Sequence, residues 1–233
     1  MKASVIAFVL AVLVSACGGS RDAEVPPVAV DSAPASGGTT SAVAPTARPR
    51  VVFLGDSLTA GLGLDRPQSI PALIQERIDE AGYGFEVVNA GVSGDTSAGG
   101  LRRLDWSLEG DVRVLVIELG ANDGLRGLPT DELKKNLMQV IDAARAKGIS
   151  VLLTGMEAPP NYGPAYTSAF RQVYMELSEL PGVTFMPFFL DGVAGDVRLN
   201  QRDGIHPNPE GARVVEGNVW RVLEPMLKSR MAR

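Results

Sequence analysis

Short apolar runs alternate with amphipathic stretches along the chain from residue 50 onward. The runs have the length and continuous hydrophobicity of parallel strands that are buried on both faces. The stretches between them suit helices that cover such a sheet. The pattern therefore predicts an α/β protein, a three-layer α/β/α sandwich with a parallel sheet of about five strands. The predicted strands are residues 51–54, 85–88, 112–117, 149–154 and 183–186.

Two helices are clearest in the pattern. The first lies between the third and fourth strands, with Thr130 as its expected N-cap, acidic residues in its first turn and an end at Gly148. Its expected buried face is Leu133, Leu137, Val140, Ile141 and Ala144. The last helix should open at Pro209, directly after Asn208. Its expected buried face is Val215, Val219, Val222, Leu223 and Met226.

The first 49 residues differ in composition from the rest, and residues 1–16 have the pattern of a secretory signal peptide. The segment starts with the basic Lys2, continues with an apolar stretch and ends with the small residues Ser15 and Ala16. It is too short to span a bilayer comfortably. A retained membrane anchor is the alternative, and the lack of a basic flank after the segment argues against it.

Cys17 is the only cysteine of the chain, so an internal disulfide is excluded. The sequence Val14-Ser15-Ala16-Cys17 resembles a bacterial lipobox, and the resemblance implies cleavage before Cys17 and lipidation of that residue. Several acyl chains on one residue anchor a protein stably, whereas a single chain is marginal. A coincidental cysteine is the alternative. Because Gly18 rather than aspartate follows, the likeness to such signals favours the bacterial outer membrane, facing the periplasm.

Residues 17–49 are expected to form a flexible tether behind this cysteine. They contain no aromatic residue and consist largely of Ala, Ser, Thr, Gly, Pro and Val, which cannot bury enough surface to fold. Residues 50–233 are then a single domain of ordinary size. The chain has a net charge of −5, and loss of Lys2 with the signal makes it more negative, which argues against nucleic-acid binding.

A serine and the only histidine of the chain are the first candidates for chemistry. Ser57 lies in a Gly-flanked turn directly after the first strand, where its hydroxyl would be presented at the sheet edge. A hydrolytic serine needs a base, and His206 is the only imidazole available. Asp203, three residues earlier, is suited to hold the imidazole tautomer. The alternatives are a turn role for Asp203 and a structural loop role for His206.

Two further polar segments are expected beside this pair. Residues 89–96 follow the second predicted strand, and residues 120–124 follow the third. The carboxyl ends of parallel strands meet at one edge of a sheet, so the loops that follow them converge there. The loop that carries His206 precedes the last helix and can reach the same edge.

Four motifs of the chain resemble those of the SGNH (GDSL-type) hydrolase family. They occur in the family's order and span nearly the whole domain. The resemblance implies a flavodoxin-like SGNH-hydrolase fold and a catalytic set of Ser57, Asp203 and His206. It also implies an oxyanion hole formed by the N–H groups of Ser57 and Gly94 and the side-chain amide of Asn122. The motifs are Gly55-Asp56-Ser57-Leu58-Thr59, Asn89-Ala90-Gly91-Val92-Ser93-Gly94-Asp95-Thr96, Gly120-Ala121-Asn122-Asp123-Gly124 and Asp203-Gly204-Ile205-His206-Pro207-Asn208.

Within the family, the chain most resembles the periplasmic acyl-CoA thioesterases and lysophospholipases, which are also described as arylesterases. Ala121 departs from that branch, which often has a second glycine there. The loop after the fourth strand borders the acyl pocket in those enzymes, so Met156, Pro159 and Tyr162 are expected to bind substrate. An ordinary Pro-stiffened surface loop is the alternative. The likeness rests on Ser93-Gly94-Asp95-Thr96, Asn122-Asp123-Gly124-Leu125-Arg126-Gly127 and Asn161-Tyr162-Gly163.

Other chemistries fit the composition less well. One histidine and one cysteine cannot form a zinc site, so we expect neither a metal nor another cofactor. Thr59 stands where the Gly-x-Ser-x-Gly elbow of conventional α/β-hydrolases needs its second glycine. Asp56, Asp95 and Asp123 also lie in the motifs, and we interpret them as hydrogen-bond acceptors that shape the loops.

The sequence thus predicts a lipid-anchored serine esterase of the bacterial cell envelope that works through an acyl-serine intermediate. Its expected substrates are carboxylic esters or thioesters, such as lysophospholipids, aryl esters and acyl-CoA-like thioesters. One alternative is a deacetylase of acetylated cell-envelope sugars. Another, from a different class, is a non-catalytic lipoprotein that binds acyl chains. Its signature would be loss of Ser57, Asn122 or His206, and all three are present.

Overall fold

The computed structural model describes residues 48–231. The predicted signal peptide (1–16), Cys17 and the tether as far as residue 47 lie outside the described residues. In the part of the chain that is described, no helix combines the length and the hydrophobicity needed to cross a bilayer.

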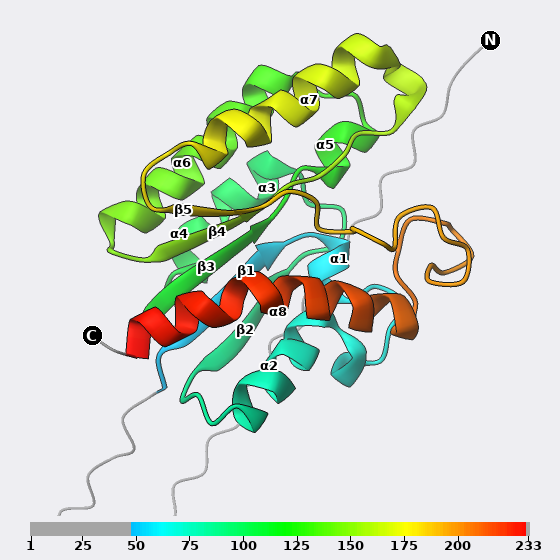
Figure 1. Cartoon of the computed structure of the whole chain (residues 1–233). Coiled ribbons are helices and arrows are strands. Elements are labelled where there is room, and N and C mark those ends of the chain that lie inside the picture. The colour runs from blue at the N-terminus through cyan, green and yellow to red at the C-terminus, as the bar shows by residue number, and fades with distance from the viewer. Residues whose placement is uncertain (1–47, 232–233) are drawn as a thin grey trace, which may run out of the picture. The chain divides into compact units, whose positions relative to one another are not determined.

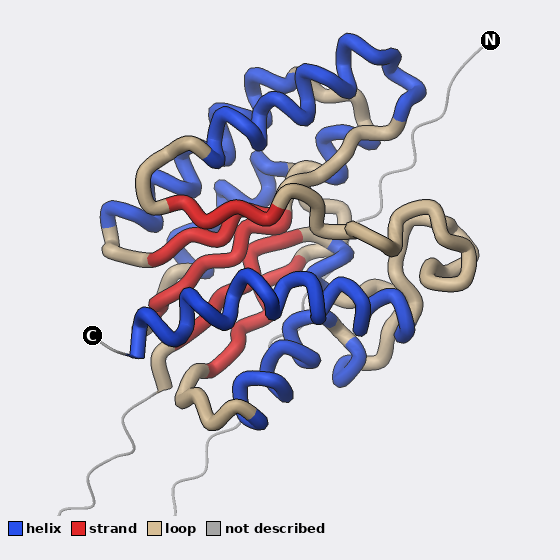
Figure 2. The backbone as a smooth tube through the Cα atoms, in the orientation of Figure 1, coloured by secondary structure: helices blue, strands red, loops and turns tan. Residues whose placement is uncertain are grey.

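A five-stranded parallel sheet forms the middle layer of the domain (Figure 2). The strand order β2-β1-β3-β4-β5 is the doubly wound, flavodoxin-like order, so the predicted fold class is confirmed. In this order the chain reverses its direction of travel across the sheet between β1 and β3, and ligands bind at such a point. The strands are β1 (Arg50–Gly55), β2 (Glu86–Gly91), β3 (Val112–Glu118), β4 (Ser150–Thr154) and β5 (Val183–Met186).

Helices cover both faces of the sheet (Figure 1). On one face α2 packs against α8, and on the other α6 packs against α3 and α7. Two 3₁₀ turns, Arg66–Gln68 and Pro160–Tyr162, lie in the loops. The helices are α1 (Ser57–Ala60), α2 (Ile70–Glu80), α3 (Ser97–Arg102), α4 (Leu104–Ser107), α5 (Ala121–Leu125), α6 (Thr130–Ala146), α7 (Gly163–Ser178) and α8 (Pro209–Met231).

The core lies between the sheet and these two helical layers. The apolar residues of β1, β3 and β4 are buried almost completely because helices cover both of their faces. The five apolar residues predicted for the inner face of α6 are all buried, as the period of 3.6 requires. The helix ends at Ala146 with Lys147 as its C-cap, and Gly148 follows with a φ of +71°, which suits glycine.

Strand β2 is longer than the sequence predicts. Asn89, Ala90 and Gly91, which we expected in the following loop, continue the strand and pair in register with the last residues of β1. A Cβ on Gly91 would lie 2.3 Å from the backbone nitrogen of Ala60, so glycine permits the close approach of α1. The small and polar side chains of this segment therefore serve the contact with α1, which local composition does not reveal.

Two details of the helices also differ from expectation. Thr130 is the first residue of α6 and not its N-cap; Pro129 is the N-cap, and its carbonyl accepts the N–H of Leu133 at 3.2 Å. In α8, Met226 is only partly buried, and Leu227 takes its place on the inner face. Leu227 lies one turn after the buried Leu223, so both face the core. Val222, predicted for the same face, is partly buried as well.

A substitution of Leu137, whose side chain is fully buried, tests whether this face of α6 contributes to the core. We expect Leu137→Ala to lower the free energy of unfolding by about 2–5 kcal/mol, through lost contacts and the cavity left behind. Urea denaturation measures this change. Gln139→Ala, at an exposed position of the same helix, should change it by less than about 0.5 kcal/mol. Equal losses in the two variants would contradict the assignment.

Candidate active site

The serine turn lies at the carboxyl end of β1. Ser57 is the first residue of α1, and Asp56 before it is the N-cap, whose carboxylate accepts the N–H of Leu58 at 3.0 Å. Gly61 ends the helix with a φ of +78°. A helix of four residues is not stable by itself, so the caps and the packing around it hold this turn. Ser57 lies in the wall of a pocket.

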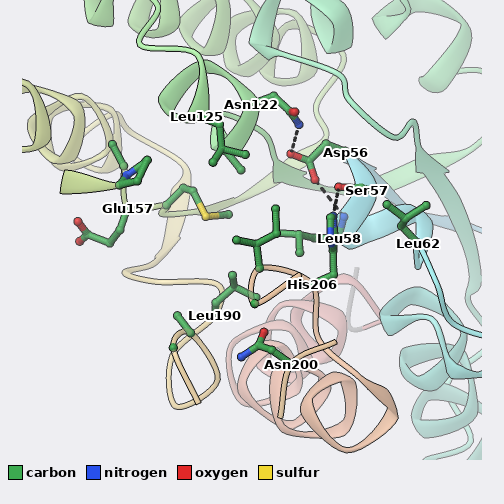
Figure 3. Close-up of a pocket in the computed structure, with 18 of the residues that line it drawn as sticks. Asp56, Ser57, Leu58, Leu62, Asn122, Leu125, Glu157, Leu190, Asn200 and His206 are labelled. Carbon is green, nitrogen blue, oxygen red and sulfur yellow. Dashed lines mark hydrogen bonds between the residues drawn. The ribbon is translucent and has the colours of Figure 1, made fainter. Parts of the chain in front are cut away.

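Ser57, His206 and Asp203 form a continuous chain of hydrogen bonds. Ser57 Oγ lies 2.8 Å from His206 Nε2, and His206 Nδ1 lies 2.7 Å from Asp203 Oδ2. Figure 3 shows Ser57 and His206 facing each other. In this arrangement Nδ1 donates to the carboxylate, which leaves Nε2 free to accept the serine proton. The structure thus brings together the three side chains that the sequence singled out.

The loop of residues 203–206 orients the Asp203 carboxylate. Its Oδ1 accepts the backbone N–H groups of Ile205 at 3.0 Å and His206 at 3.1 Å. Gly204, between Asp203 and Ile205, has a φ of +77°. The hydrogen bond from His206, together with that from Ile205, lowers the pKa of Asp203 to about 2. The carboxylate is therefore ionised at neutral pH and can stabilise an imidazolium.

Gln201 ties the histidine loop to the serine turn. Its backbone N–H donates to the carbonyl of His206 at 2.7 Å. Its side-chain amide donates to the carbonyls of Leu62 at 2.7 Å and Pro207 at 2.9 Å. Leu62 comes just after the Gly61 C-cap of α1, so these bonds connect the histidine loop to the segment that carries Ser57.

Three hydrogen-bond donors line the pocket around Ser57. Among residues 48–231, the N–H groups of Ser57 and Gly94 have no protein acceptor. Gly94 has a φ of +85°, a conformation that favours glycine. The Asn122 amide donates one hydrogen to Asp56 Oδ2 at 2.9 Å, which leaves its second hydrogen for a ligand (Figure 3). Together the three donors can stabilise an oxyanion formed at Ser57.

Arg103 joins the segments that carry two of these donors. Its guanidinium contacts the carboxylate of Asp95 at 2.7 Å, beside Gly94, and donates to the carbonyl of Gly55 at 2.7 Å and that of Ala90 at 2.6 Å. The ends of β1 and β2 and the Gly94 loop are thereby linked through one side chain. Asp95 is an acceptor, as predicted, but its cationic partner was not anticipated.

Comparison with known proteins places this site in a family. The model of the GDSL-like lipase/acylhydrolase family matches residues 53–214. The chain belongs to the GDSL-like lipase/acylhydrolase family. It is 47% identical over 178 residues to the esterase TesA of Pseudomonas aeruginosa, covering 76% of this chain and 89% of that protein.

Other relatives of this GDSL-like hydrolase include enzymes named for several ester substrates. It is 40% identical over 162 residues to an arylesterase of Vibrio mimicus, covering 69% of this chain and 81% of that one. It is 35% identical over 178 residues to thioesterase 1/protease 1/lysophospholipase L1 of Escherichia coli, covering 76% and 84%. These relationships identify the chain as a carboxylic ester hydrolase and confirm the predicted family and enzyme class.

A solved structure of a related esterase has a closely similar fold. The esterase EstA from Pseudoalteromonas sp., in a form inhibited by monoethylphosphonate, matches with a TM-score of 0.73 and 34% identity. The match covers 77% of this chain and 98% of that one.

The pocket of this hydrolase is a cavity of about 680 Å³ that opens beside Ser57. Met156 and Pro159, two of the three residues predicted to bind substrate, line it. The other apolar side chains in its wall include Leu58, Leu62, Leu125, Phe188, Leu190 and Ile205. Within residues 48–231, no group of three or more His, Cys, Asp or Glu side chains is arranged to hold a metal ion.

Tyr162, the third residue predicted to bind substrate, is not among those that line the pocket, and its role in substrate binding stays a prediction. Its hydroxyl donates to the carbonyl of Leu125 at 3.2 Å, and its ring packs against Tyr166 and Gly127. The 3₁₀ turn Pro160–Tyr162 directs the side chain to this position. Tyr162 instead supports the segment that carries Leu125, which does line the pocket.

The sequence interpretation missed part of the pocket wall. Phe188, Leu190, Ala194 and Gly195 come from the segment after β5 and line the cavity opposite α5. The position of this segment in the sequence could have revealed it. The segment follows the carboxyl end of a parallel strand and therefore reaches the same edge of the sheet as the four motifs. Glu118, the last residue of β3, was also missed; it lies fully buried behind the serine turn.

Asn122→Ala tests the proposed donor set of the pocket. We expect kcat to fall about a hundredfold to a thousandfold, because a donor aimed at the oxyanion acts in the transition state. KM should change little, since the ground-state ester needs this donor less. Steady-state kinetics with p-nitrophenyl acetate measure both constants. An unchanged kcat in a folded variant would contradict the role of Asn122.

Proposed function

We propose that Ser57 is the nucleophile of this esterase, His206 its general base and Asp203 the residue that orients His206. The observation that carries the proposal is the 2.8 Å contact between Ser57 Oγ and His206 Nε2 in a pocket with unpaired donors. A serine hydroxyl is unreactive at neutral pH unless a base takes its proton, and this contact supplies the base.

The geometry supports a two-step reaction. His206 Nε2 takes the Ser57 proton as Oγ attacks the ester carbonyl, and Asp203 stabilises the imidazolium that forms. The N–H groups of Ser57 and Gly94 and the amide of Asn122 receive the oxyanion. The intermediate collapses as His206 returns the proton to the departing alcohol or thiol, which leaves an acyl group on Ser57. Water, deprotonated by His206, then hydrolyses this acyl-serine.

We further propose that the substrates are acyl esters and thioesters with an extended apolar chain. The largely apolar wall of the cavity suits a hydrocarbon chain, which gains free energy when it leaves water. The names of the relatives, arylesterase and thioesterase/lysophospholipase, are consistent with aryl esters, acyl thioesters and lysophospholipids as substrate classes. The same wall offers few polar groups to a sugar, so it does not favour a glycan deacetylase.

An activity profile across acyl lengths tests this substrate class. With p-nitrophenyl esters from acetate to octanoate, we expect kcat/KM to rise by up to about fourfold per buried methylene, which corresponds to about 0.8 kcal/mol each. An acyl-CoA and a lysophospholipid should be hydrolysed by the same site. A strict preference for acetate, together with activity on acetylated glycans, would instead support the deacetylase.

The matched controls are two serine variants. Ser57→Ala should abolish hydrolysis of every substrate and labelling by a fluorophosphonate, because both require the same hydroxyl. Ser229→Ala, at an exposed serine near the far end of α8, should leave both unchanged. Full activity in Ser57→Ala would contradict the proposed nucleophile.

We also propose that the esterase is a lipoprotein of the bacterial cell envelope, anchored to the outer membrane through Cys17. The support is the likeness of residues 14–17 to a lipobox and the signal-like pattern of residues 1–16. The tether is rich in Ala, Pro, Ser and Thr and would allow the catalytic domain to work at a distance from the membrane.

Cys17→Ser tests the anchor. In a host that processes lipoproteins, we expect the wild-type protein to partition into the detergent phase and its N-terminal peptide to carry acyl groups. The variant should move to the aqueous phase, because it lacks the thiol that is lipidated. Mass spectrometry and detergent partitioning measure these properties. A wild-type protein without lipid on residue 17 would contradict the proposal.

A further inference from the structure

A second carboxyl group lies behind the serine turn and has no part in the reaction described above. Glu118 ends β3 and pairs in register with Gly55, and its side chain is fully buried. Burial of a carboxyl group is costly unless hydrogen bonds or a proton compensate for the loss of water. Its position in the core, directly behind the site, therefore calls for a physical explanation.

One oxygen of Glu118 holds both sides of the serine turn. Oε2 accepts the backbone N–H of Asp56 at 3.2 Å and the hydroxyl of Thr59 at 2.8 Å. A Cβ on Gly55 would lie 2.6 Å from this oxygen and 2.0 Å from Thr59 Oγ1, so glycine permits the approach. Ser57 lies between these two anchor points and is positioned by them.

Asp56 extends the contacts of Glu118 to the oxyanion donors. The Asp56 carboxylate, also fully buried, accepts Leu58 N–H at 3.0 Å and the Asn122 amide at 2.9 Å. The backbone of Asp56 is thus held by Glu118, and its side chain orients Asn122. A chain of contacts runs from β3 through the serine turn to α5.

The two buried carboxyl groups cannot both carry a charge at low cost. Burial and the neighbouring charge of Asp56 raise the pKa of Glu118 well above its ordinary value. Burial raises the pKa of Asp56 as well, but hydrogen bonds from Leu58, Asn122 and Glu118 oppose that rise. Glu118 Oε1 has no partner among the donors of the described residues, so it is the atom that can hold the proton.

Two other groups lie near this pair. His206 favours the ionised form of Asp56. The hydroxyl of Tyr174 on α7 donates to the carbonyl of Leu119, and burial, followed by the nearby carboxyl groups of Asp123, Glu118 and Asp56, raises its pKa well above the ordinary value, so it stays neutral. Neither neighbour supplies a charge that would ionise Glu118. The protonated, neutral form of Glu118 is therefore the one that its surroundings favour.

We propose that Glu118 is a positioning residue that acts as a neutral acid: it fixes the serine turn through Oε2 and keeps its proton, so that the neighbouring Asp56 remains the anion that orients Asn122. The proposal rests on the proposed roles of Ser57 and Asn122. It assigns to β3 a direct part in aligning the nucleophile with the oxyanion donors, although Glu118 itself touches no substrate.

Two substitutions test the positioning role. Glu118→Gln retains an acceptor for the Asp56 N–H and the Thr59 hydroxyl and, like the neutral acid, carries no charge, so kcat should stay within about threefold of the wild type. Glu118→Ala removes both bonds, and kcat should fall by about 10- to 100-fold with KM within about twofold. Wild-type kcat in Glu118→Ala, or an equal loss in both variants, would overturn the proposal.

Glu216→Gln is the matched control, because Glu216 is another buried glutamate but lies on α8, paired with Arg77. It should leave kcat unchanged. A fall in kcat equal to that of Glu118→Ala would show that loss of any buried acid impairs the enzyme and would overturn a specific role for Glu118.

The pH dependence of unfolding tests the neutral form without using activity. A group whose pKa is raised in the folded state stabilises the fold at acidic pH, and this contribution is lost as the pH rises toward the folded-state pKa. As the pH is raised from about 5 to about 8, the Tm of the wild type should therefore fall relative to that of Glu118→Gln. A difference in Tm between the wild type and Glu118→Gln that stays constant over that range would contradict the proposal that Glu118 is neutral.

The variants of Ser57 and of Glu118 can fail independently, so an error in the role of Glu118 is distinguishable from an error in the proposed function. If Ser57→Ala stays active, the proposed nucleophile is wrong, whatever Glu118 does. If Glu118→Ala does not fold, the Glu118→Gln variant decides alone: near-wild-type kcat with a pH-dependent Tm difference supports the proposal, and any other combination overturns it.

Discussion

The parallel pairing of β1 with its two neighbours is the constraint on which the site depends. In this register Gly55 faces Gly91 of β2 on one side and Glu118 of β3 on the other. All three strands end at the same edge, so the loops that follow bring Ser57, Gly94 and Asn122 to a single pocket. Gln201 and Arg103 then fasten the histidine loop and the Gly94 loop to that edge.

Burial assigns different tasks to the acidic groups around the serine. Asp203 lies near solvent, and the hydrogen bond from His206 lowers its pKa to about 2, so it is an anion suited to support an imidazolium. Glu118 lies in the core beside Asp56, and burial raises its pKa well above the ordinary value. The Asp56 carboxylate accepts hydrogen bonds from the Leu58 N–H and from the Asn122 amide, so it links the serine turn to α5. The same functional group thus serves as charge, acid or acceptor according to its surroundings.

Much of this organisation could be predicted from the chain alone. The strands of the core are visible as apolar runs because helices cover both faces of the sheet. The inner face of α6 follows from its period, and His206 is conspicuous as the only histidine. Prediction failed where a contact from elsewhere overrides local pattern. Asn89 and its neighbours, for example, extend β2 because β1 pairs with them.

The amino-acid sequence by itself determined the order of the elements, the fold class and the residue types available for ester chemistry, because these depend on local periodicity and on side-chain identity. Only the tertiary structure decided which groups meet. Nothing in the run that ends at Glu118 indicates that this carboxyl group faces Asp56, since the two lie 62 residues apart and meet only through strand pairing. The wall formed by the segment after β5 likewise exists only once the strands are side by side. Such contacts arise from packing between distant segments, which a one-dimensional pattern does not encode.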